Sequence, residues 1–118
     1  MSNDGRQKFG ATVRREREKL EIGLREMAKK IGISPTYLSK VERDEFLPPA
    51  EDKVKAIAEI LDLDVDELLA LAGKVSSELT EIIRRHPREM ASFLRAANGL
   101  TAEDMARLAS RAKKAKEK

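Results

Sequence analysis

The side chains best suited to recognition chemistry lie in the segment SPTYLSKVER, residues 34–43. If this segment is a helix, Leu38 and Val41 face the protein core. The outer face then carries Pro35, Thr36, Ser39, Lys40 and Arg43. Hydroxyl, ammonium and guanidinium groups on one helix face can donate hydrogen bonds to base edges and to phosphates. The segment therefore has the chemistry of a nucleic-acid contact.

Individual side chains of this segment match individual groups of duplex DNA. The ammonium group of Lys40 can donate to guanine O6 or N7, and the methyl group of Thr36 can contact a thymine methyl. The hydroxyl of Ser34 can reach a phosphate, although the same hydroxyl can cap a helix that begins there. Tyr37 is the only tyrosine, and it can either contact DNA or pack against a neighbouring helix.

A helix-turn-helix is predicted as the scaffold for these side chains. Apolar residues recur at i, i+3, i+4 and i+7 in Leu24, Met27, Ala28 and Ile31. Gly32 can end that helix with a positive φ, and Ser34 followed by Pro35 is a strong signal for the start of the next one. The motif spans residues 24–43, and its recognition helix, residues 34–43, is expected in the major groove. The alternative is an ordinary helical hairpin within a bundle.

Helical periodicity extends over nearly the whole chain, without two-residue hairpin signals or sustained alternation of apolar and polar residues. The predicted fold class is therefore all-α. In the first helix, Phe9, Val13 and Leu20 are expected on one side. Two further helices after the motif are marked by Val54, Ile57, Ala58, Leu61, Val65, Leu68, Leu69 and Ala72. We expect a five-helix DNA-binding domain over residues 7–73.

Residues 74–118 are predicted to form a short C-terminal helical extension, interrupted at Pro87 and at Asn98 and Gly99. Its apolar stripes include Ile82, Ile83, Met90, Phe93, Leu94, Met105 and Leu108. These side chains either fold back onto the monomer or form a two-fold interface. We favour a homodimer, because a helix-turn-helix domain usually needs a partner to cover successive half-sites. Short helices of this kind seldom enclose a small-molecule pocket.

The run GLREMAKKIGISPTYLSKVERDEFLPP resembles the helix-turn-helix of the lambda-repressor-like, or XRE, family of bacterial and phage regulators. The preceding FGATVRREREKL is similar to the first helix of that family, and VKAIAEILDLDVDELL is similar to its closing two helices. The resemblance covers about residues 9 to 72. It implies a five-helix DNA-binding domain that is usually dimeric on an operator and most often acts as a repressor.

The resemblance also assigns roles to positions of this sequence. Thr36 and Lys40 fall where family members contact bases, whereas Arg43 and Tyr37 fall where they touch the DNA backbone or its sugar edge. Arg25, near the start of the preceding helix, can add a backbone contact. The predicted DNA-contact set is Arg25, Ser34, Pro35, Thr36, Tyr37, Ser39, Lys40 and Arg43.

Glu42 is acidic on a helix expected to face DNA. In the family such a glutamate pairs with an arginine of the first helix, here matched by Arg17, so the resemblance implies a structural ion pair. Two departures limit the transfer. Leu24 stands where many members have a glutamine bonded to phosphate, and Pro35 stands where a base-reading polar residue is common. The operator sequence therefore cannot be copied from a relative.

Charge is spread unevenly along the chain, although the net charge is only +3. Residues 6–43 carry eleven Lys and Arg against five Asp and Glu, residues 44–72 carry two against nine, and residues 73–118 carry eleven against six. This pattern suits a protein with one face on a polyanion and another turned away from it. Ordinary solvated helix surfaces are the alternative explanation.

The sequence contains no pattern typical of an enzyme, a metal site or a cofactor site. His86 is the only histidine, and it precedes a proline at a helix boundary, where a solvated cap residue is expected. The absence of cysteine fits a reducing compartment, with the cytoplasm as the default. No stretch approaches the roughly 18 apolar residues that span a bilayer, and the start lacks the apolar region of a secretory signal. We expect a soluble protein without a membrane partner.

The leading hypothesis is a dimeric, sequence-specific transcriptional regulator that represses by binding an inverted-repeat operator in double-stranded DNA. The alternative is a helix-turn-helix antitoxin or interaction protein, whose C-terminal helices bind a protein partner while DNA binding is secondary. A gene for a small toxin beside this one would favour the alternative.

Overall fold

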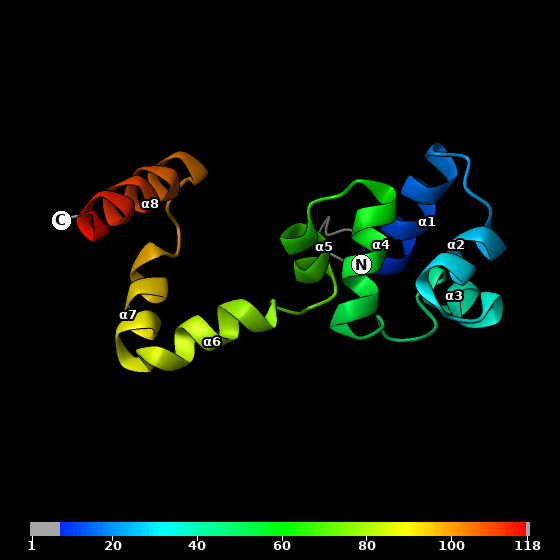
Figure 1. Ribbon diagram of the computed structural model, residues 1–118, viewed down its shortest axis with the longest axis horizontal. Coiled ribbons are helices and arrows are strands. Elements are labelled where there is room, and N and C mark those ends of the chain that lie inside the picture. Colours follow the sequence, from blue (N-terminus) through cyan, green and yellow to red (C-terminus); the bar gives the residue numbers. More distant parts are fainter. Residues whose placement is uncertain (1–7, 118) are drawn as a thin grey trace. The chain divides into compact units, whose positions relative to one another are not determined.

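The computed structural model describes residues 8–117, and every regular element within that range is an α-helix. The helices in chain order (Figure 1) are α1 (Phe9–Lys19), α2 (Leu24–Ile31), α3 (Pro35–Glu42), α4 (Glu51–Leu61), α5 (Val65–Leu71), α6 (Ser77–Arg85), α7 (Pro87–Ala97) and α8 (Ala102–Lys116). The predicted all-α class is confirmed. The chain divides into two compact units, with the boundary between Ser77 and Glu78. None of the helices described here is long and apolar enough to cross a membrane.

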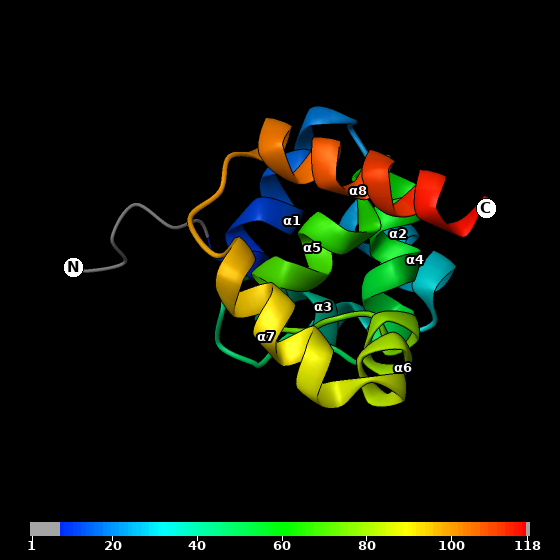
Figure 2. The same cartoon turned by 90° about the vertical axis from the view of Figure 1, so that its left-hand side faces the viewer.

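The N-terminal unit packs α1 to α5 around one apolar core. Helix α3 lies against α1 and α2, while α4 contacts α1, α2 and α5 (Figures 1 and 2). The largest fully buried side chains are Val13, Met27, Leu38, Val41, Val54, Ile57, Leu68 and Leu69. Each of the five helices contributes at least one of these residues. Burial of their apolar surface therefore holds the five helices together and fixes α3 against α1 and α2.

The turn between α2 and α3 follows from local sequence. Gly32 adopts φ +79° after the last residue of α2, and its N–H donates to the carbonyl of Ala28 at 2.9 Å. The hydroxyl of Ser34 accepts from the N–H of Tyr37 at 3.0 Å, and Pro35 occupies the first turn of α3. The recognition helix therefore begins at the residue that the sequence indicates.

The start of α1 is held by the turn that follows α3. A Cβ atom on Gly10 would lie 2.0 Å from the carbonyl oxygen of Val41, so only glycine permits this approach. The carboxylate of Asp44 accepts from the N–H of Gly10 at 2.9 Å and from the N–H of Ala11 at 3.2 Å. Because Lys8 provides no side-chain cap, Asp44 acts as the cap of α1 from a distant part of the chain.

The expectation that Leu20 lies with Phe9 and Val13 on the apolar side of α1 is wrong. Phe9 and Val13 are buried, but Leu20 is 50% exposed and lies just beyond the last residue of the helix. The backbone leaves the helical path there, because Glu21 adopts φ +58°. Arg17 is the residue that turns inward near this end of α1.

The C-terminal unit comprises most of α6, all of α7 and α8. The hydroxyl of Thr101 accepts from the N–H of Asp104 at 3.0 Å and caps α8. None of the described residues in these three helices is buried. An open, mostly apolar groove of about 710 Å³ lies between α7 and α8, and its lining includes Phe93, Leu94, Met105 and Leu108. This unit therefore lacks a buried core of its own.

Candidate nucleic-acid interface

Helix α3 divides its side chains between the core and the surface. Leu38 and Val41 are buried, as is Glu42. Among the predicted DNA contacts, Arg25, Ser34, Thr36 and Arg43 are exposed, while the half-buried ones are Pro35, Tyr37, Ser39 and Lys40. All eight predicted contacts are thus at least partly accessible.

Five of these eight residues line a single shallow depression formed by α2 and α3. The depression measures about 250 Å³ and is lined by Arg25, Pro35, Thr36, Ser39 and Arg43, together with Leu24. Two guanidinium groups and two hydroxyl groups therefore share one open site, beside the apolar surface of a proline and a leucine. Such a site can meet both phosphates and base edges.

Tyr37 and Lys40 are absent from the lining of that depression and contact Phe46 instead. The Lys40 Nζ atom lies 5.1 Å from the centroid of the Phe46 ring, within the range of a cation–π interaction. The rings of Tyr37 and Phe46 are tilted by 48°, with centroids 5.9 Å apart. Phe46 is 46% exposed. Its place beside the recognition helix was missed from the sequence, where no periodicity marks a loop residue.

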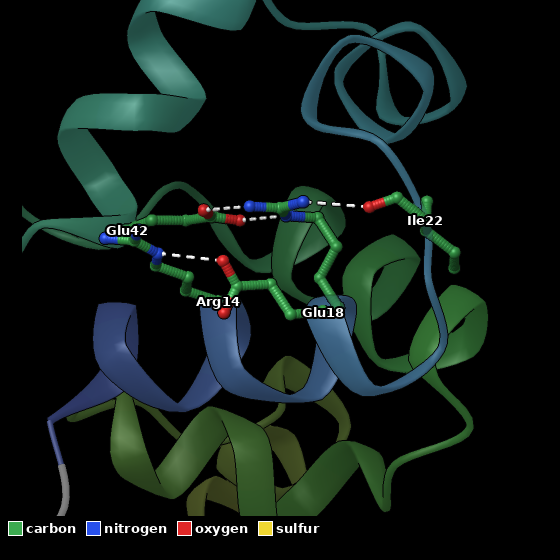
Figure 3. Close-up of polar contacts among 5 residues, drawn as sticks. Arg14, Glu18, Ile22 and Glu42 are labelled. Carbon is green, nitrogen blue, oxygen red and sulfur yellow. Dashed lines mark hydrogen bonds and ion pairs between the residues drawn. The ribbon is translucent and has the colours of Figure 1, made fainter.

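The acidic residue of α3 is neutralised inside the protein. Arg17 Nε lies 2.8 Å from Glu42 Oε2, and Arg17 Nη2 donates to Glu42 Oε1 at 2.9 Å (Figure 3). The Glu42 side chain is only 3% exposed, and that of Arg17 is 10% exposed. The hydrogen bond to Glu42 raises the pKa of Arg17 above its ordinary value, although burial opposes this effect. The carboxylate is therefore withdrawn from the outer face of α3.

Arg14 is a second residue that the sequence did not single out. With Arg17, Leu24, Ser39, Glu42 and Arg43 it lines a depression of about 220 Å³. Arg14 Nε lies 3.2 Å from Glu18 Oε2, one helical turn away (Figure 3). In the sequence Arg14 is one charge in a highly charged helix, and no local signal distinguishes it from its neighbours.

Two of the predicted contacts already have partners within the protein. The Ser34 hydroxyl is engaged as the cap of α3, and Arg43 Nε lies 3.1 Å from Glu45 Oε2. Both members of the Arg43 pair are exposed, so solvent screens their attraction. Arg43 can therefore exchange Glu45 for another anion at low cost.

The residues predicted for dimerisation fall into two groups. The groove between α7 and α8 brings together Phe93, Leu94, Met105 and Leu108. The remaining three do not line that groove: Ile82, Ile83 and Met90. All seven are exposed or half-buried.

Residues 8–117 contain no cluster of three His, Cys, Asp or Glu residues that could hold a metal ion. His86 is exposed at the N-cap position of α7, and its side chain makes no capping hydrogen bond there.

The sequence of the N-terminal unit matches a known family. The family described as "Helix-turn-helix domain" matches residues 10–74, more than half of the chain. This chain is a lambda-repressor-like helix-turn-helix protein. Members of the family are DNA-binding transcriptional regulators and not enzymes.

Several curated relatives resemble this helix-turn-helix protein. The ImmF control region 10 kDa protein of Bacillus phage phi105 is 37% identical over 65 residues, which is 55% of this chain and 70% of the phage protein. An HTH-type transcriptional regulator of Mycobacterium tuberculosis is 32% identical over 75 residues, which is 64% of this chain. The match spans about half, 53%, of the length of that mycobacterial relative.

Among solved structures, the P22 c2 repressor in complex with a synthetic operator is 30% identical in sequence to this helix-turn-helix protein, with a TM-score of 0.49. The superposition covers 53% of this chain and 94% of the repressor chain.

Proposed function

We propose that this helix-turn-helix protein is a dimeric transcriptional repressor that binds an inverted-repeat operator. Helix α3 lies in the major groove, where Thr36 and Lys40 meet base edges. Arg25 and Arg43 contact backbone phosphates on either side of Ser39. Bound across a promoter, the dimer excludes the transcription machinery. The compartment proposed for this activity is the cytoplasm.

The observation that carries this proposal is the shared depression of α2 and α3. Arg25, Pro35, Thr36, Ser39 and Arg43 open onto one surface, while Glu42 points into the core. Phosphate and the guanine edge are electron-rich and accept hydrogen bonds, so a surface of hydroxyls and guanidiniums suits them. A carboxylate at the same place would repel the DNA backbone, and Arg17 keeps it away.

The dimer in this proposal is supported by the exposed apolar residues of the C-terminal unit. A single recognition helix covers only a few base pairs, so specific affinity usually requires two linked helices on successive half-sites. A two-fold pair of subunits reads an inverted repeat, with half-site centres about 10 base pairs apart. Self-association of the apolar side chains of α7 and α8 would supply that linkage.

Selection of bound duplexes from a random pool, followed by sequencing, tests the proposal. The expected product is an inverted repeat with half-site centres about one helical turn apart. A reporter gene placed under a promoter that contains this sequence should then be transcribed less when the protein is present. Lack of any enriched sequence would contradict sequence-specific binding, and higher transcription would contradict repression.

A second candidate function is favoured by the groove between α7 and α8. This open apolar surface also suits the helix of a different protein, as expected for an antitoxin or another interaction protein. The oligomeric state separates the two candidates. A full-length chain that binds DNA yet stays monomeric at micromolar concentration would favour a separate protein partner.

A further inference from the structure

Besides the buried Arg17, three arginines line the two depressions to which Leu24 belongs. Arg14 and Arg43 line the depression between α1 and α3, while Arg25 lines the neighbouring depression formed by α2 and α3. Leu24, Ser39 and Arg43 belong to both linings. The two depressions are therefore adjoining parts of one surface, with Arg14 at one side and Arg25 at the other.

Each acidic group near the α1 side of this surface is paired with an arginine of the protein. Glu42 is buried in its pair with Arg17, so it offers no carboxylate to a ligand. Glu18 and Glu45 pair with Arg14 and Arg43, at 3.2 Å and 3.1 Å. These four side chains are about half exposed, and ion pairs in that environment contribute little to stability. Duplex DNA, with its closely spaced phosphates, can therefore displace either glutamate.

We propose that Arg14, Ser39 and Arg43 form a binding site for one phosphate of the DNA backbone. This inference rests on the proposed function, in which α3 enters the major groove. The Leu24 side chain offers no hydrogen bond, so the polar groups that share its depression hold the anion. Each guanidinium can donate two parallel hydrogen bonds to phosphate oxygens, and the Ser39 hydroxyl can donate one.

The position of Arg14 decides which part of DNA it contacts. Arg14 belongs to α1, whereas the predicted base-reading side chains Thr36 and Lys40 belong to α3. A residue that flanks the recognition helix from another element meets the sugar–phosphate backbone and carries no information about the base sequence. Arg14 therefore contributes equally to the affinity for the operator and for unrelated DNA.

Arg15 provides a matched control on the same helix. Arg14 and Arg15 are adjacent, their side chains are 55% and 50% exposed, and each has an ion pair with a glutamate of α1. Arg15, however, lines a different depression, together with residues of α5 such as Leu68 and Leu71. A change at Arg15 removes the same charge without touching the proposed phosphate site.

The experiment compares the full-length wild-type chain with Arg14→Ala and Arg15→Ala. Binding to the selected operator and to an unrelated duplex of equal length is measured over a series of salt concentrations. Arg14→Ala should weaken binding to both duplexes by about 10- to 100-fold, as expected for loss of a charge-assisted hydrogen bond. The salt slope should fall by about one unit for each subunit. Arg15→Ala should stay within about two-fold of the wild type.

A third variant, Glu18→Gln, tests the same site in the opposite direction. Removal of the competing carboxylate should tighten binding to both duplexes, because Arg14 then need not break an ion pair with Glu18 before it contacts a phosphate. Equal effects of Arg14→Ala and Arg15→Ala would overturn the inference, and so would a loss confined to the operator. If the wild-type chain binds neither duplex, the proposed function itself fails, and that result is distinct from a failure at Arg14 alone.

Discussion

Arg17 of α1 and Glu42 of α3 form a two-pronged ion pair that joins the first helix to the recognition helix. A third hydrogen bond runs from Arg17 Nη1 to the carbonyl of Ile22 at 2.8 Å, in the segment that leads into α2 (Figure 3). One guanidinium thus connects three consecutive elements of the DNA-binding unit. No buried side-chain nitrogen or oxygen among the described residues is left without a hydrogen bond. The pair therefore positions α3 without leaving an uncompensated charge.

Replacement of Glu42 by alanine should destabilise the fold by about 3 to 5 kcal/mol, because the buried guanidinium of Arg17 then lacks its carboxylate partner. Denaturant unfolding measures this change. The surface variant Glu18→Ala serves as a control and should cost less than about 1 kcal/mol. The double variant Arg17→Met with Glu42→Leu should recover most of the loss. Unchanged stability together with tighter DNA binding would mean that Glu42 faces the DNA.

Gly10→Ala should also destabilise the protein, by about 1 to 3 kcal/mol, because its Cβ atom would collide with the backbone of α3. The colliding atom is the carbonyl oxygen of Val41, which cannot move as a flexible side chain can. Gly23→Ala is the matched control, since no heavy atom outside its immediate neighbours lies within 4 Å of the added Cβ atom. Thermal unfolding of both variants measures the difference. Equal melting temperatures would show that α1 can shift away from α3.

The parts of this fold that were foreseen depend on short-range signals. Gly32, Ser34 and Thr101 act within three or four residues, and each ends or begins a helix where its side chain or backbone preference predicts. Apolar periodicity predicted α1, α4 and α5, and the family resemblance joined them to the motif as one five-helix domain.

The parts that were missed depend on contacts between distant segments. Asp44 caps α1 across more than thirty residues, and Phe46 reaches back to Lys40 from a loop without periodicity. The place of Arg14 beside Arg43 follows from the packing of α1 on α3. Neither the spacing nor the type of these residues predicts such contacts, because the contacts form only when the core has assembled. The buried core could be foreseen more fully than the binding surface for this reason.

Lys40→Ala should weaken binding to the operator by about 1 to 3 kcal/mol and leave binding to unrelated DNA nearly unchanged, as expected for a base contact. Equilibrium titration of both duplexes at one salt concentration measures the two effects. Lys55→Ala, on α4, removes an equal charge away from the recognition helix and should affect neither. Equal losses on both duplexes would remove Lys40 from the set of base-reading residues.

Arg43→Ala should weaken binding to every duplex and flatten the dependence of affinity on salt, because a phosphate contact releases a counterion irrespective of sequence. The paired variant Glu45→Gln should strengthen binding, since it frees Arg43 from its internal partner. Titrations between about 50 and 200 mM salt resolve the slope. An unchanged slope for Arg43→Ala would show that its guanidinium does not reach a phosphate.

The exposed apolar residues of the C-terminal unit should hold two copies of the chain together. Helices α6 to α8 bury none of their described side chains, whereas the N-terminal unit has its own core. Truncation after Ser77 keeps the hydrogen bonds between Ser77 and Glu51 and should leave a folded monomer. The fragment should bind the operator weakly, because each subunit meets its half-site alone and loses the effective concentration that linkage provides.

A full-length variant separates dimerisation from the other effects of truncation. Phe93→Asp with Leu94→Asp places two charges in the groove between α7 and α8, and it should dissociate the dimer while the chain stays intact. Sedimentation of the wild type, the double variant and the fragment at micromolar concentration gives the three masses. A dimeric wild type with two monomeric variants supports self-association through the groove. If the wild type and the fragment share one oligomeric state, the C-terminal helices do not hold the dimer together.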